Sequence, residues 1–163
     1  MNSKSFSRAL YIGYVFYKNG SPLGPRIQDG LQLVYVYEGE ATIRIDDAVR
    51  VLREGEATLL LPGCRETFQF SRTTVTHHGW CTADGARPGS DDMADLLEFP
   101  YKAALPPMMR QLADRALPLQ GTDEAKSVSL MNALIEALFQ DYLRTVSFRA
   151  PPRTPVHPAV RRA

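Results

Sequence analysis

The chain has 163 residues, of which 44% are hydrophobic and 23% charged, and its formal net charge is +1. These values are ordinary for a globular domain with a buried core, and they exclude a strong overall field that would attract nucleic acid or a membrane surface. Two cysteines are too few for a disulfide scaffold, and we find neither a signal peptide nor an apolar run of about 20 residues. We therefore expect a soluble, cytoplasmic protein.

The segment before Gly20 is rich in aromatic side chains. We interpret residues 1–20 as an N-terminal arm that can fold over the mouth of the domain that follows. Its aromatic residues are Phe6, Tyr11, Tyr14, Phe16 and Tyr17.

Short β-type segments separated by turn signals follow from Leu31 to Ala83. They are rich in β-branched and aromatic residues or alternate polar with apolar ones, as strands do. Glycine, proline or acidic pairs stand between them, which is typical of tight turns. Strands at this spacing predict a barrel or a sandwich. The predicted strands cover residues 31–37, 41–45, 49–53, 57–61, 67–70 and 73–82.

Helical patterns follow a polar loop at residues 84–95. One helix is predicted at 105–117, with Pro106 and Pro107 in its first turn, where prolines are tolerated. Another is predicted to begin at Thr122 and to run to about Val146. Apolar residues recur along the second helix at steps of three and four. This stripe fits either the core of one chain or a surface shared by the barrel and a second subunit. Its members are Val128, Met131, Ile135, Leu138 and Tyr142.

The end of the chain is rich in proline and arginine. Residues 149–163 contain four of each, which predicts an extended linker or a disordered terminus. The last five residues, preceded by Pro158, are typical of the first turn of a helix.

Four motifs occur in an order that matches a known family. They are Gly24-Pro25-Arg26, residues 33–39 with their terminal glycine, residues 53–63 ending in Pro-Gly, and His78-Gly79-Trp80. Their order resembles that of a cupin barrel, and more closely the arabinose-binding-type domain of AraC transcription regulators. Residues 156–163 are similar to the junction into the DNA-binding half of these regulators. The resemblance covers the chain from about Tyr14 to Ala163.

This resemblance implies a mainly β fold: a cupin-like double-stranded β-helix (jelly-roll) barrel followed by two α-helices. It implies an arm at 1–20, an effector-binding barrel at 21–100, a helical dimerisation segment at 101–148 and a linker at 149–163 to an absent helix-turn-helix domain. The expected partners are a small effector of the sugar or organic acid type and a second copy of the chain. DNA would be bound only through the missing domain, and no membrane partner is expected. The stripe Val128, Met131, Ile135, Leu138 and Tyr142 is the predicted dimer interface.

The histidines argue against the metal site of many cupins. Those proteins carry a His-x-His pair on one strand and a further histidine after the Pro-x-Gly turn, whereas this chain has three histidines in all. His77 and His78 are adjacent on a predicted strand, so they point to opposite faces and cannot share one metal. A catalytic metal needs about three converging ligands. We therefore expect no cofactor.

Four residues are candidates for effector binding. His78 and Trp80 are two apart and hence on one strand face, and the resemblance implies that they line the effector pocket together with Phe68 and Arg26. A tryptophan offers a flat apolar face, a histidine one donor and one acceptor, and an inward arginine favours a carboxylate or a dense hydroxyl pattern. Each could equally serve the structure alone, with Arg26 in a surface ion pair and the other three in the core.

Three functions are consistent with the sequence. The first is an effector-sensing and dimerisation domain of a transcription regulator, which is not an enzyme. The second is a small cupin enzyme, an isomerase or an oxygenase, which would hold a metal. The third is a barrel with a filled interior that serves assembly alone.

Overall fold

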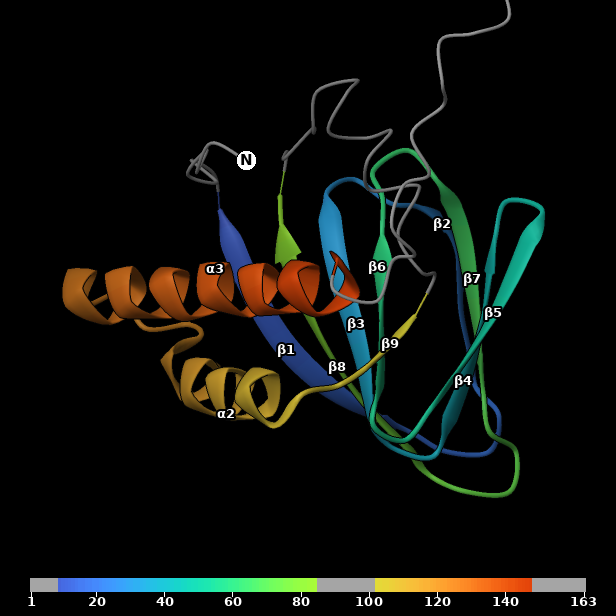
Figure 1. Cartoon of the computed structure of the whole chain (residues 1–163). Helices are drawn as coiled ribbons and strands as arrows, with labels where there is room; N and C mark the ends of the chain where they lie inside the picture. Colours follow the sequence, from blue (N-terminus) through green and yellow to red (C-terminus); the bar gives the residue numbers. More distant parts are fainter. Residues whose placement is uncertain (1–8, 85–101, 148–163) are drawn as a thin grey trace, which may run out of the picture.

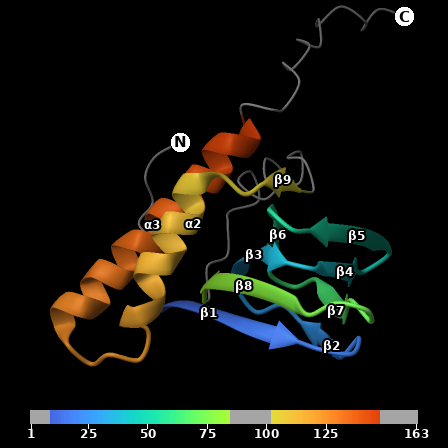
Figure 2. The same cartoon turned by 90° about the horizontal axis from the view of Figure 1, so that it is seen from below.

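The computed structural model describes residues 9–84 and 102–147. Two antiparallel sheets face each other, and two helices cover the outer face of one of them (Figure 1, Figure 2). The first sheet has the strand order β1-β8-β3-β6-β9 and the second the order β2-β7-β4-β5. The strands are β1 (Leu10–Tyr17), β2 (Pro22–Ile27), β3 (Leu31–Glu38), β4 (Glu40–Ile45), β5 (Ala48–Arg53), β6 (Glu56–Leu60), β7 (Arg65–Phe70), β8 (Thr76–Ala83) and β9 (Ala103–Ala104).

The central strand β3 separates two hydrophobic cores. Its residues 31–37 are all buried, because one face packs on the helices and the other on the second sheet. Leu33 and Tyr35 belong to the core under the helices, whereas Val34 and Val36 belong to the core between the sheets. This two-sided burial explains why the strand reads as an unbroken apolar run with one polar member, Gln32.

All six predicted strands are present within a few residues of their expected ends. Three strands were not predicted: β1, β2 and the two-residue β9. From Leu10 to Tyr17 the expected arm is instead the edge strand β1, paired with β8 along its whole length. Its residues alternate between the two faces, with Ile12 under the helices and Tyr17 in the core between the sheets. Residues 1–8 lie outside the described part of the chain.

Two helices follow the barrel. They are α2 (Pro107–Ala116), which continues into the 3₁₀ turn Leu117–Leu119, and α3 (Ala125–Ser147). α2 begins with a proline at its first helical position, as predicted. α3 begins three residues later than predicted, and the Thr122 hydroxyl donates to the Leu119 carbonyl in the turn before it. The predicted mainly β architecture with two C-terminal helices is thus confirmed.

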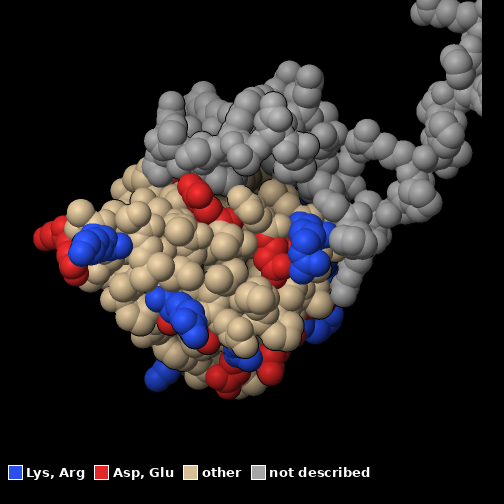
Figure 3. All heavy atoms as spheres, turned by 60° about the vertical axis from the view of Figure 1, so that its left-hand side comes forward, with Lys and Arg blue, Asp and Glu red and all other residues tan. Residues whose placement is uncertain are grey.

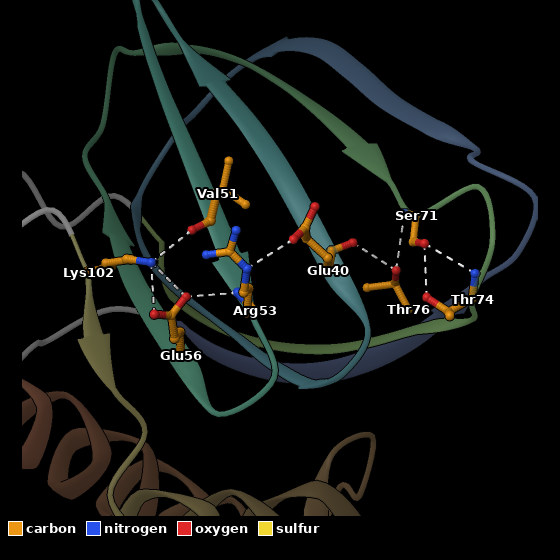
Figure 4. A network of polar contacts seen from close by, with 8 residues as sticks. All are labelled: Glu40, Val51, Arg53, Glu56, Ser71, Thr74, Thr76 and Lys102. Atoms are coloured by element: carbon orange, nitrogen blue, oxygen red, sulfur yellow. Dashed lines mark hydrogen bonds and ion pairs between the residues drawn. The ribbon is translucent and has the colours of Figure 1, made fainter.

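Polar contacts connect the chain before α2 to the barrel (Figure 4). The Lys102 ammonium lies 2.8 Å from the Glu56 carboxylate and donates to the Val51 carbonyl at 3.3 Å. Glu56 also accepts from the Arg53 backbone N–H, and Arg53 is ion paired with Glu40. The start of β9 is thereby held against the turn between β5 and β6.

No helix in the described part of the chain is long and apolar enough to cross a membrane. The predicted linker at 149–163 and the loop after Asp84 lie outside the described residues.

Candidate ligand-binding site

A pocket of about 330 Å³ lies where the two sheets approach each other at the turn between β2 and β3. We call it the first pocket. Residues of β1, β2, β3 and β8 form its walls, and two exposed acids, Asp29 and Asp84, lie at its rim. It is lined by Tyr11, Arg26, Ile27, Gln28, Asp29, Gly30, Gln32, Trp80, Thr82 and Asp84.

The strand pairing of β2 brings Arg26 against Glu66. Leu23 is paired with Phe68 and Arg26 with Glu66, so β2 carries one extra residue between these positions. Gly24 lies in this irregularity with a φ of +94°, and a Cβ there would come within 2.7 Å of the Glu66 carbonyl oxygen. Because Arg26 and Glu66 are opposite each other, their side chains meet, with 2.7 Å between Nε and Oε1.

This ion pair is unequally buried. The Glu66 side chain is 0% exposed, whereas 39% of the Arg26 side chain reaches solvent. Burial raises the pKa of Glu66, and the Arg26 guanidinium opposes that shift. The positive charge expected to attract an anionic ligand is therefore already compensated inside the protein.

Further hydrogen bonds extend from Arg26 across the floor of the first pocket. Arg26 Nη2 donates to Gln32 Oε1 at 3.0 Å, and Gln32 Nε2 donates to Thr82 Oγ1 at 2.9 Å. Gln32 and Thr82 are cross-strand partners of β3 and β8. The floor is polar, fixed by mutual hydrogen bonds and balanced in charge.

Trp80 forms an apolar wall of the same pocket, and Gly13 makes room for it. Gly13 is the β1 partner of Trp80 in the sheet. A Cβ at Gly13 would lie 2.6 Å from Cζ2 and 2.9 Å from Cε2 of the indole. The indole therefore lies against the β1 backbone, where a larger residue would displace it.

The Gly13→Ala variant is expected to move the Trp80 ring and to cost about 1–3 kcal/mol of stability, as overpacking does. Trp80 is the sole tryptophan of the chain, so its fluorescence maximum reports the movement directly. Tyr14→Val, on the opposite face of the same strand, should leave the maximum unchanged. An unshifted spectrum in Gly13→Ala would contradict the close approach.

The structure brings all four predicted ligand-binding residues together, in two layers. Arg26 and Trp80 line the first pocket. Phe68 and His78 lie behind them in the core between the sheets, 1% and 3% exposed. The Arg26 guanidinium carbon is 5.7 Å from the Phe68 ring centre, and the Phe68 and His78 rings are 6.1 Å apart.

Burial dominates the chemistry of His78. Together with the charge of Arg26 and the neighbouring His77, it lowers the pKa of His78 to about 4, so the ring is neutral at pH 7. Its Nδ1 has no hydrogen-bond partner among the described residues. The His78 ring lies nearly parallel to the rings of Tyr17 and Phe70, with ring centres 5.6 and 5.2 Å away, and these two rings stack directly on each other at 3.8 Å.

The two adjacent histidines point to opposite faces of β8, as the strand alternation predicts. His77 contacts Tyr14 and Phe16 on the outer face, whereas His78 contacts the core between the sheets. Within residues 9–84 and 102–147, no group of three or more metal-ligating side chains converges. The absence of a cofactor stays a prediction.

The predicted interface stripe on α3 faces inward. Four of its five members are at most 6% exposed and belong to the core under the first sheet, and Val128 is half-buried. This position fits the alternative in which the stripe forms the core of a single chain. The buried residues are Met131, Ile135, Leu138 and Tyr142.

Several pocket residues were missed by the sequence reasoning. Glu66 is not among the residues predicted from the sequence, because nothing local reveals that Arg26 is its partner 40 positions away. Thr82 could have been found, since the alternation that pairs His78 with Trp80 continues to it. The same applies to Gln32, the polar member of the apolar run of β3.

Comparison with known proteins finds one matching family model and several similar solved structures. The family model of the AraC-like ligand binding domain matches residues 17–138. An RmlC-like cupin from Methanocaldococcus jannaschii is similar at 13% identity and a TM-score of 0.44, over 47% of this chain and 71% of that chain. An RmlC-like cupin from Shewanella frigidimarina is similar at 20% identity and a TM-score of 0.42, over 48% and 68%.

A cupin superfamily protein from Desulfitobacterium hafniense is similar at 17% identity and a TM-score of 0.42, over 47% of this chain and 67% of that chain. No curated protein matches the sequence significantly. The family model covers well over half of the chain, from the end of β1 to the second half of α3. The chain therefore belongs to the family of AraC-like ligand-binding domains.

Proposed function

We propose that this domain senses a small, neutral, polyhydroxylated metabolite of the sugar type on behalf of a transcription regulator. The first pocket carries this proposal. It combines the flat indole of Trp80 with the hydrogen-bonded floor of Arg26, Gln32 and Thr82. An apolar wall with a few fixed polar groups is the usual design of a small-molecule site.

The charge balance of the pocket favours a neutral ligand over an organic acid. Glu66 compensates Arg26, and the rim adds the acids Asp29 and Asp84. A carboxylate entering this pocket would meet two rim carboxylates and an arginine whose charge is already neutralised. A sugar meets amide and hydroxyl groups that donate and accept, and its C–H face can lie on the indole.

A fluorescence titration of the whole chain tests this function. Trp80 lines the pocket and is the sole tryptophan, so a bound ligand should change its emission. A panel of neutral sugars and polyols is compared with a panel of organic acids. A neutral binder at 100 times its Kd should also stabilise the fold by about 2.7 kcal/mol in urea unfolding.

The matched variants are Trp80→Leu, which should lose the ligand-induced stabilisation, and Val49→Ala on β5, which should keep it. Val49 is exposed and lies outside the first pocket. Stabilisation by organic acids alone would overturn the assignment of the ligand class. Stabilisation that survives in Trp80→Leu would overturn the assignment of the pocket.

We further propose that two copies of the chain associate through the solvent-exposed side of α3. With its buried stripe in the core, α3 leaves Leu130 54% exposed, and Ala133 is exposed one turn further along. Figure 3 shows uncharged surface between separate groups of charged side chains on this side of the molecule. A modestly apolar, weakly charged helix face suits a contact between subunits.

The Leu130→Asp variant is expected to shift the protein from dimer to monomer, because it places a charge in the centre of this face. Analytical ultracentrifugation over a concentration series measures the shift. Val49→Asp introduces the same charge at an equally exposed position on β5 and should leave the dimer intact. If both variants or neither dissociate, the contact lies elsewhere.

A further inference from the structure

A second pocket lies on the other face of the first sheet, outside the barrel. Its volume is about 350 Å³, and it shares no residue with the first pocket. We call it the aromatic pocket. Strands β1, β3 and β8 supply one side, and α2 with the turn after it supplies the other. Its lining residues are Tyr14, Phe16, Tyr37, His77, Arg110, Asp114 and Leu117.

The strand side of this pocket is a cluster of four rings, from Tyr14, Phe16, Tyr37 and His77. Phe16 stacks on His77 with ring centres 4.1 Å apart, and Tyr14 meets Phe16 edge-on at 5.8 Å and 86°. Tyr37 closes the cluster 4.9 Å from His77. Two perpendicular ring faces form a corner into which a third flat ring can fit, stacked on one face and edge-on to the other.

The outer rings of this cluster are exposed although the sheet face that they share is otherwise covered. On the same face of β1, Leu10 and Ile12 are at most 4% exposed, because the helices cover them. Tyr14 and Phe16 are 54% and 52% exposed. Adjacent exposed aromatic rings on a pocket wall are a usual mark of a binding surface.

The helix side presents one charge of each sign, one helical turn apart. The Arg110 guanidinium carbon lies 4.8 Å from the Tyr37 ring centre, and the Tyr37 hydroxyl donates to Asp114 Oδ1 at 3.5 Å. Both charged side chains are exposed, and neither takes part in the ion pairs found among the described residues. Arg110 can therefore still receive a carboxylate along its edge, and Asp114 an ammonium group.

His77 supplies a further polar group to this pocket. Its Nε2 is buried and has no hydrogen-bond partner among the described residues. Burial lowers the pKa of His77, which favours the neutral ring, and a neutral ring can donate one hydrogen bond and accept one.

We propose that the aromatic pocket is a second ligand site, taking a small molecule that joins a flat aromatic ring to a carboxylate and an ammonium group, as a free aromatic amino acid does. The ring occupies the corner between Tyr14 and Phe16. The carboxylate pairs with Arg110 and the ammonium with Asp114. A singly charged aromatic ligand would satisfy one of these groups and leave the opposing charge beside it.

Calorimetric titration of the whole chain with L-phenylalanine tests the site, because this probe leaves the protein's tryptophan signal free. Phenethylamine lacks the carboxylate, and 3-phenylpropionate lacks the ammonium group. L-phenylalanine is expected to bind at least about tenfold more tightly than either analogue, since each loses one charge-assisted hydrogen bond. No binding of L-phenylalanine, or equal binding of all three compounds, would overturn the proposal.

Variants assign the binding to this pocket and to its charges. Phe16→Ala is expected to weaken L-phenylalanine binding about tenfold or more, whereas Tyr11→Ala, at a comparably exposed position on the other face of β1, should not. Arg110→Gln should remove the preference over phenethylamine, and Asp114→Asn the preference over 3-phenylpropionate. Trp80 lines the first pocket and not the aromatic pocket, so Trp80→Leu should leave L-phenylalanine binding unchanged. If Tyr11→Ala or Trp80→Leu abolishes it, the ligand occupies the first pocket and the second site is refuted.

Discussion

Replacing Arg26 by methionine is expected to destabilise the domain by about 2–3 kcal/mol at pH 7.5. The substitution leaves the Glu66 carboxyl without its partner at a side chain that is 0% exposed. Removing one partner of a fully buried ion pair costs about 3–5 kcal/mol. We expect a smaller loss of about 2–3 kcal/mol, because solvent reaches 39% of the Arg26 side chain and already screens the pair.

The reciprocal substitution Glu66→Leu should cost less. It leaves Arg26 without a carboxylate, but the guanidinium can reach water from its partly exposed position. The double variant Arg26→Met/Glu66→Leu removes both charges and should be more stable than Arg26→Met alone. Urea unfolding of the four proteins measures these differences. Equal losses in the two single variants would contradict the unequal burial of the pair.

The cost of Arg26→Met should shrink as the pH falls. Burial raises the pKa of Glu66 above its ordinary value, and loss of the arginine removes the charge that opposes this shift. The folded variant then binds a proton at a higher pH than the unfolded chain does. The penalty is present above the folded pKa and disappears as the pH falls towards the unfolded pKa of about 4.5. Unfolding at pH 5 should therefore separate Arg26→Met from the natural chain by less than at pH 7.5.

The Arg26–Glu66 pair shows which part of the site could be predicted from the sequence and which could not. Motif order placed Arg26, Phe68, His78 and Trp80 in one region, and the structure brings them together. The partner of Arg26 depends on the register of β2 against β7, which an extra residue at Gly24 shifts. Register between strands that are distant in sequence leaves no local trace. The sequence alone therefore could not predict that the charge of Arg26 is compensated by Glu66, on which the proposed ligand class depends.

The strand β1 and the stripe on α3 show a second limit: periodicity predicts the faces of an element but not what packs against them. Alternation along β8 correctly separated His77 from His78, because a strand has a fixed period. The apolar stripe of α3 was likewise real, but a stripe does not reveal what covers it. In the structure Met131 and Ile135 pack within the chain. Aromatic residues on β1 suggested a mobile arm, although pairing with β8 fixes them in the sheet.

The stability of the domain is expected to fall by about 2 kcal/mol between pH 8 and pH 5 because of His78 alone. Burial, followed by the charge of Arg26, lowers its pKa from 6.5 to about 4. Since the unfolded chain then takes up the proton first, the contribution is fully present above pH 6.5 and is lost as the pH falls towards 4. The complete change corresponds to about 3 kcal/mol.

Matched variants separate the contribution of His78 from those of other groups. Glu56, for example, titrates below this range. Burial raises the pKa of Glu56, but the hydrogen bond from Lys102 and further contacts outweigh burial, so the pKa is lowered. Its contribution is lost only as the pH falls below about 4.5. His78→Gln should flatten the pH dependence of the unfolding free energy between pH 8 and pH 5. His77→Gln should change it less, because that ring is only half-buried. An unaltered slope in His78→Gln would show that His78 is protonated without cost, and that the core between the sheets is open to water at this point.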